Sequence, residues 1–261
     1  METFYEYLLI GGMPEAVETY LETKSFQESR MILKDLYDNY LSDMELYQAS
    51  PESIIRSQKI FGNIYTQLNK ESKNFSPSLI ERKAKGRDMR TPIDWLTLAF
   101  IVEKSSLIKE KVSIPLLSSN ESLYRLYLSD IGMFSYQSGI NATIFIDKNI
   151  RNTLSGIFFE NYVANELTRA GIELFYWKGK NNVEFEFIVQ CHNQVIPIDV
   201  KKSKGSLNSL KKFADHNQLK LAIKISANQY DYDEKNQILT IPFYDVFLLC
   251  SDIANDTLDY I

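Results

Sequence analysis

Three charged residues in the C-terminal half have the types and spacing of a metal-dependent phosphodiesterase site. Asp199 and Lys201 occupy alternate positions in the segment 195–202, and Glu186 lies in the preceding apolar segment 183–190. Carboxylate oxygens are hard ligands that suit Mg²⁺ or Mn²⁺. A bound ion could polarise a phosphodiester and lower the pKa of an attacking water. Lys201 could orient that water or stabilise the charge that builds up on the phosphate.

Two neighbouring strands are needed to position these side chains. Side chains alternate between the faces of a strand, so each segment has one apolar face and one face that carries charge. The polar segment 191–194 suits a tight hairpin between the two strands. An even-numbered loop centred within it sets Glu186 opposite Asp199 and Glu184 opposite Lys201.

Two interpretations of this charged face remain open. Directly opposed carboxylates repel each other, and a bound divalent cation would remove the repulsion. Glu160, on the preceding helix, could then complete the metal shell. The alternative is a half-solvated hairpin in which Glu184 and Lys201 form an ordinary cross-strand ion pair.

The composition is that of a globular chain. It has 261 residues, enough for two domains, with 44% hydrophobic and 24% charged residues. The net charge of -5 argues against a surface coated with positive charge, but a local basic patch is compatible with it. The two cysteines have no metal-binding spacing, which favours a reducing compartment. The acidic N-terminus and the lack of a long apolar stretch predict a cytoplasmic protein with no membrane partner.

The first half of the chain is predicted to be mainly helical. Residues 1–50 are expected to form a lid-like segment, with helices at 2–9, 14–22 and 26–47. Residues 51–150 predict a winged-helix-like domain. Its expected elements are helices at 51–69, 76–83 and 91–103, followed by strands at 107–114 and 123–128.

A basic loop lies between the last two of these helices. Five positive residues fall within nine positions and could contact the phosphate backbone of DNA: Arg82, Lys83, Lys85, Arg87 and Arg90. The alternative is a solvated surface loop, which is what charge runs usually form.

The periodicity changes near residue 151. A helix at 152–170 is predicted, then strands at 172–177, 183–190 and 195–202, a helix at 206–215, strands at 219–225 and 237–241, and a helix at 243–250. Residues 151–261 are therefore expected to form an α/β domain with a mixed sheet covered by helices. The fold class predicted for the whole chain is α+β.

Several segments resemble a prokaryotic family of P-loop AAA-type ATPases whose C-terminal part is known as domain of unknown function 4143. The matching segments are 11–15 (GGMPE), 126–132 (LYLSDIG), 156–163 (GIFFENYV), 184–188 (EFEFI) and 196–201 (IPIDVK). They occur in the family's order and span most of the chain.

The resemblance implies a C-terminal domain similar to the PD-(D/E)XK nuclease fold. Glu160 matches the family's helical acid, Glu186 its first strand acid, and Asp199 with Lys201 its acid-x-Lys. The family usually has Asp at the position of Glu186. It also implies an ATPase module upstream, but the chain has no G-x-x-x-x-G-K-[ST] loop to hold phosphates. We therefore expect no ATP site and no ATPase activity in this chain.

Two hypotheses for function follow. The first, which we favour, is an accessory module of an AAA-type ATPase that binds nucleic acid or a partner protein through its nuclease-like domain. The second is a Mg²⁺-dependent nuclease that uses Glu160, Glu186, Asp199 and Lys201. A site closed by an ion pair of Lys201 with Glu184 or Glu186 would favour the binding module.

Overall fold

A computed structural model describes residues 2–48, 50–109, 112–140, 142, 156–179, 183–201, 210, 213 and 219–258. The chain forms two compact units. The first comprises Met1–Lys104 with Arg125–Tyr162, and the second comprises Ser105–Tyr124 with Val163–Ile261. The fold class is α+β, as predicted, with a helical N-terminal region and a mixed sheet in the C-terminal region.

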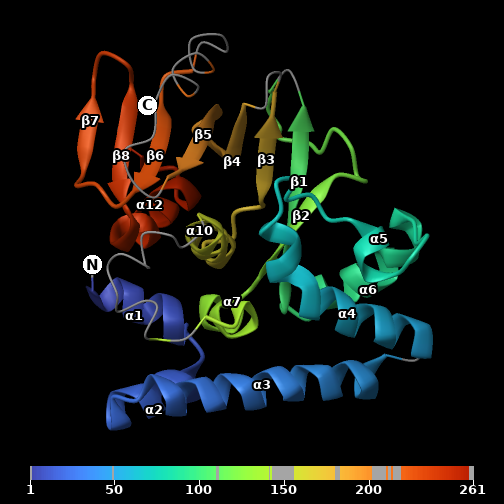
Figure 1. The fold of residues 1–261 in the computed structure, drawn as a ribbon. Helices are drawn as coiled ribbons and strands as arrows, with labels where there is room; N and C mark the ends of the chain where they lie inside the picture. Colours follow the sequence, from blue (N-terminus) through green and yellow to red (C-terminus); the bar gives the residue numbers. More distant parts are fainter. Residues whose placement is uncertain are drawn as a thin grey trace. The chain divides into compact units, whose positions relative to one another are not determined.

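The first unit is built from helices whose ends are encoded locally (Figure 1). Ser25 and Ser50 cap two of them, each accepting a hydrogen bond from a backbone N–H three residues later. The helices are α1 (Glu2–Ile10), α2 (Pro14–Thr23), α3 (Phe26–Tyr47), α4 (Pro51–Leu68), α5 (Pro77–Ile80), α6 (Gly86–Leu98) and α7 (Ile131–Ser138). The predicted helices 2–9, 14–22, 26–47 and 51–69 are confirmed within two residues at each end, whereas α7 was not predicted.

Helix α6 begins five residues before the predicted start at Thr91. Pro92 therefore lies inside the helix, where it cannot donate a hydrogen bond to the carbonyl of Asp88. The Arg56 guanidinium, on α4, donates to that carbonyl oxygen at 3.3 Å instead. The long-range partner replaces the missing bond, so the helix continues through the proline.

The turn between α1 and α2 is joined to the start of α7 by one carboxylate. Asp130 accepts hydrogen bonds from the backbone N–H groups of Gly12 and Met133, both at 2.8 Å. Gly11 has a φ of +77°, and a Cβ on Gly132 would lie 2.2 Å from the carbonyl oxygen of Ile10. We call these five residues, Gly11, Gly12, Asp130, Gly132 and Met133, the Asp130 junction. The junction gives a structural role to the glycines of the segment 11–15 and to Asp130 and Gly132 of the segment 126–132.

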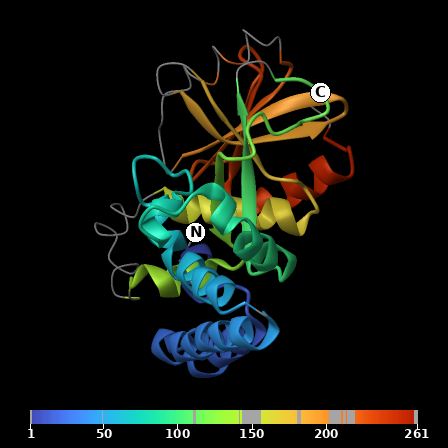
Figure 2. The same ribbon diagram turned by 90° about the vertical axis from the view of Figure 1, so that its right-hand side faces the viewer.

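The second unit contains most of an eight-stranded sheet with the order β2-β1-β3-β4-β5-β6-β8-β7. The strands are β1 (Val102–Lys109), β2 (Tyr124–Leu128), β3 (Phe175–Lys178), β4 (Glu184–Cys191), β5 (Gln194–Val200), β6 (Ala222–Ser226), β7 (Asp231–Asp233) and β8 (Ile238–Pro242). Strands β5, β6 and β8 are parallel, as are β1 and β3, while β4 is antiparallel to both of its neighbours. The view in Figure 2 shows the twist of the strands.

Strands β1 and β2 correspond to the hairpin predicted for a winged helix. They are neighbours, with a hydrogen bond from the N–H of Leu107 to the carbonyl of Leu123. However, β1 also pairs in parallel with β3, with Leu107 opposite Tyr176. The two strands are thus the edge of the large sheet rather than a separate wing, because pairing with a distant segment completes the backbone hydrogen bonds of β1.

Helices cover the sheet. Helix α12 (Val246–Ala254), preceded by the 3₁₀ turn η2 (Phe243–Asp245), packs against β4 and β8. Helix α10 (Ile157–Arg169) runs from the first unit into the second. A cluster of buried side chains joins Leu210 and Phe213 to the sheet. These two residues fall in the helix predicted at 206–215, whose other residues lie outside the described part, as do residues 152–155 of the predicted helix 152–170.

Candidate functional site

The register of the β4–β5 hairpin is the one predicted from the sequence. Phe187 lies opposite Ile198, and Cys191 lies opposite Gln194. Extending this register by one residue sets Glu186 opposite Asp199, and both carboxylates lie near the ammonium of Lys201. The two acids therefore project from neighbouring strands on the same face, while Ile198 and Val200 are buried.

The turn of the hairpin has two central residues with positive φ. His192 has a φ of 48° and Asn193 a φ of 57°, which is the type I′ geometry that matches the twist of two strands. The carboxylate of Asp256 accepts a hydrogen bond from the His192 backbone N–H at 2.8 Å. This bond is the main cause that lowers the pKa of Asp256. The two-residue turn, held by the hydrogen bond to Asp256, fixes the strand register that brings Glu186 and Asp199 together.

The acids share one ammonium group. Lys201 Nζ lies 2.8 Å from Asp199 Oδ1 and 3.9 Å from Glu186 Oε1. The other oxygen of Glu186 accepts a hydrogen bond from the Val200 backbone N–H at 3.1 Å. Both acids are buried, at 6% and 4% exposure, whereas the Lys201 side chain is 38% exposed. Lys201 thus compensates, from the solvent side, the repulsion expected between two opposed carboxylates.

A divalent ion is compatible with this donor set only after a rearrangement. Glu186 and Asp199 could hold it, but the ammonium of Lys201 takes the position next to both carboxylates. Among the described residues, no group of three or more histidine, cysteine, aspartate or glutamate side chains is placed to hold a metal ion. The proposed shell of Glu160, Glu186 and Asp199 therefore stays a prediction.

On its other side, β4 pairs with β3, and this pairing departs from regular alternation. Glu184 lies opposite Lys178 on β3, with 3.8 Å between the charged groups. The expected Glu184–Lys201 pair stays a prediction. The pairing of β3 with β4 also shifts between Phe175 and Trp177. This bulge places Phe185 against Trp177, with ring centroids 5.5 Å apart, and ends the strict alternation expected along β4.

A further charged residue on this face was missed by the sequence analysis. Lys224, on β6, lies beside Asp199, and Thr240, on β8, lies beside Lys224. Paired positions on neighbouring strands share a face, so Glu186, Asp199, Lys224 and Thr240 form one line across four strands, which we call the polar row. The signal was a single lysine within the otherwise apolar strand 221–225.

Glu160 belongs to the first unit, where it forms an ion pair with Lys73. The carboxylate is nearly buried, and the lysine is 87 positions away in the sequence. In the same helix, the Asn161 side chain exchanges two hydrogen bonds with the backbone of Leu128, at 2.8 and 3.0 Å. This part of the GIFFENYV segment therefore holds the end of β2 in place.

All five residues of the basic loop are exposed and surround the start of α6. Arg87 and Arg90 approach Asp88 and Asp94 at 3.7 and 3.9 Å, with arginine side chains nearly 80% exposed. Such exposed pairs contribute little to stability. The basic groups are therefore accessible to a ligand.

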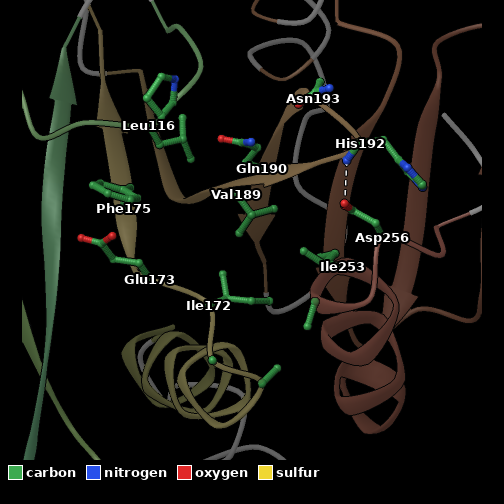
Figure 3. A pocket seen from close by; sticks show the side chains of 14 residues that line it. Leu116, Ile172, Glu173, Phe175, Val189, Gln190, His192, Asn193, Ile253 and Asp256 are labelled. Atoms are coloured by element: carbon green, nitrogen blue, oxygen red, sulfur yellow. Dashed lines mark hydrogen bonds between the residues drawn. The ribbon is translucent and has the colours of Figure 1, made fainter.

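A pocket of about 420 Å³ lies at the turn end of the β4–β5 hairpin (Figure 3). Phe175, Val189 and Ile253 give it apolar walls, and Glu173 and Gln190 stand at its polar side. Cys191 is buried nearby, and burial together with Asp256 raises the pKa of its thiol to about 11. The thiol is thus protonated and unreactive at neutral pH.

A family model described as domain of unknown function DUF8612 matches residues 1–144, more than half of the chain. The chain belongs to the DUF8612 family. In this DUF8612 protein, a second model, domain of unknown function DUF4143, matches residues 155–244 and so covers the polar row and Lys201. DUF4143 is a domain found with AAA ATPases.

No curated protein and no solved structure matches this DUF8612 chain. Across the described residues, its helices are too short or too polar to cross a membrane.

Proposed function

We propose that the chain is an accessory module of an AAA-type ATPase that binds nucleic acid without cutting it. The observation that carries the proposal is the group of five exposed basic side chains at the start of α6. Exposed lysine and arginine near a helix N-terminus suit phosphate groups. The match to a domain that is found with AAA ATPases supports the link to such an ATPase.

The state of the acid pair supports binding without cleavage. An ammonium already lies beside both Glu186 and Asp199, so the positive charge that a catalytic metal would supply is present in another form. In this proposal the nucleic-acid contacts are made by the basic loop.

Binding is tested by the anisotropy of a labelled DNA duplex over a range of salt concentrations. Neutralising Arg82, Lys83 and Lys85 to glutamine should lower the affinity at least tenfold and reduce the salt slope by about 2.7, if each contacts one phosphate. The control is Lys24, Lys34 and Lys70 changed to glutamine, which removes the same charge from exposed positions of the same unit. An equal effect of both triple variants would contradict a specific role of the loop.

A Mg²⁺-dependent phosphodiesterase is the second candidate function. The observation that favours it is the convergence of Glu186 and Asp199 on one cationic group. Calorimetric titration with Mg²⁺ and Mn²⁺, beside the Asp199→Asn variant, and a cleavage assay on the same duplex separate the candidates. Metal-dependent cleavage that Asp199→Asn abolishes would establish the nuclease and overturn the non-cleaving module.

A further inference from the structure

Lys224 is a buried residue that forms no ion pair with the described residues. Its side chain lies in the middle of β6 and the residue is 5% exposed. Within the described residues, its ammonium has neither a hydrogen bond nor an ion pair with any group. Lysine is seldom so deeply buried without a partner, because removing an ammonium from water is costly. A residue held in this state is expected to have a use for its charge.

The neighbours of Lys224 indicate what kind of ligand could bind its ammonium group. Asp199 lies beside it on β5, but the Asp199 carboxylate is already 2.8 Å from Lys201. Thr240 lies on its other side on β8, nearly buried at 8% exposure. The polar row therefore has its acids at one end compensated by Lys201, and an ammonium and a hydroxyl at the other end.

We propose that Lys224 and Thr240 form a subsite that binds a phosphate group. The ammonium supplies three donors and a full positive charge, and the hydroxyl supplies a further donor. Strands β5, β6 and β8 are parallel and adjacent (Figure 1), so Asp199, Lys224 and Thr240 lie side by side on one face of the sheet. Lys201 limits the repulsion that Glu186 and Asp199 would exert on the phosphate.

The phosphate could belong to a small molecule or to a polymer. Inorganic phosphate, a 5′-mononucleotide and a 5′-phosphorylated single-stranded oligonucleotide carry the same group, so they are titrated separately by calorimetry at constant ionic strength. Tighter binding of the mononucleotide assigns a free nucleotide, and tighter binding of the oligonucleotide assigns a nucleic-acid backbone. Because the subsite belongs to the second unit and the basic loop to the first, the oligonucleotide is also titrated against the loop triple variant.

Substitutions locate the binding. Lys224→Met should weaken phosphate binding about tenfold or more, and Thr240→Val should weaken it less. The control Lys220→Met removes an exposed lysine just before β6 and should leave the affinity unchanged. Equal binding by Lys224→Met and the unaltered chain, or no detectable phosphate binding by the unaltered chain, overturns the subsite. Equal binding of acetate overturns the choice of phosphate.

Thermal unfolding without ligand gives a second readout that a structural lysine would not produce. If the Lys224 charge is kept for a ligand, Lys224→Met should raise Tm by about 2–4 °C, because it replaces an unpaired buried ammonium with an apolar group. Phosphate should raise Tm for the unaltered chain and not for the variant. A lower Tm of Lys224→Met in the absence of ligand would show that the lysine stabilises the fold, and would overturn the proposal.

Discussion

The Asp130 junction and the polar row both contain buried charged side chains, but these charges are compensated differently. Asp130 has both carboxylate oxygens bonded to backbone N–H groups. In the polar row, two acids lie beside one lysine whose side chain is 38% exposed, and Lys224 has no partner among the described residues. A charge bonded to backbone groups stabilises a connection between elements. A buried charge without a partner lowers the stability of the fold, so its presence indicates that a ligand supplies the partner.

The Asp130 junction should give the largest loss of stability. Asp130→Ala removes the acceptor for two backbone N–H groups, and hydrogen bonds to a charged group contribute about 1.5–3 kcal/mol each. We therefore expect a loss of about 3–5 kcal/mol in the free energy of unfolding, measured by urea titration. Asp38→Ala, at an exposed position of α3, is the control and should cost less than about 0.5 kcal/mol. A small cost for both would mean that the junction does not join α1, α2 and α7 tightly.

Lys201→Met should have an intermediate effect. It leaves Glu186 and Asp199 buried and opposed, and breaking a buried pair costs about 3–5 kcal/mol. Because the Lys201 side chain is 38% exposed, we expect a smaller loss of about 1–3 kcal/mol at pH 7.

The matched control for Lys201 is Lys178→Met, which removes only the longer, more exposed pair with Glu184. It should cost about 0.5 kcal/mol or less. If the two lysine variants have the same stability at pH 7, Lys201 is not what compensates the strand acids.

In how its charge is compensated, Glu166 is intermediate between the Asp130 junction and the polar row, because its carboxylate has one charged partner. Its substitution should show the smallest effect. Burial raises the pKa of Glu166, and Arg169, 2.7 Å away, opposes this shift. Since the folded-state pKa is above the unfolded value, this group's contribution is fully present below the unfolded pKa and is lost as pH rises through the folded pKa. The Tm of Glu166→Gln, relative to that of the unaltered chain, should therefore rise by about 1–2 °C from pH 4 to pH 7.

Thermal melts at several pH values, with Glu173→Gln as an exposed control, measure this difference. A difference in Tm that stays constant from pH 4 to pH 7 would show that Arg169 cancels the effect of burial.

Local patterns predicted much of the fold. Serine caps and the prolines after Met13 and Ser50 set the starts of α2, α3 and α4 within a residue. Strand alternation together with an even hairpin loop gave the register of β4 and β5, and with it the approach of Glu186 to Asp199. These features depend on residues close together in the sequence, so a single sequence contains the information.

Features that depend on distant partners were not predictable in the same way. The pairing of β1 with β3 joins segments separated by about seventy residues, and Arg56 makes it possible for α6 to pass through Pro92. The Glu160–Lys73 pair and the bulge beside Trp177 also arise from tertiary contacts. The place of Lys224 beside Asp199 and Thr240 depends on the pairing of β6 with β5 and β8, which are separate segments of the chain.

The ends of the sheet have a consequence for solubility. An unpaired edge strand can recruit the edge of another molecule and start aggregation. At one end, all five residues of β2 are buried. At the other end, β7 is only three residues long and has Asp231 and Asp233 at its two ends. A short edge with negative charge repels an identical edge, so the protein should remain dispersed at concentrations at which a longer apolar edge would lead to fibres.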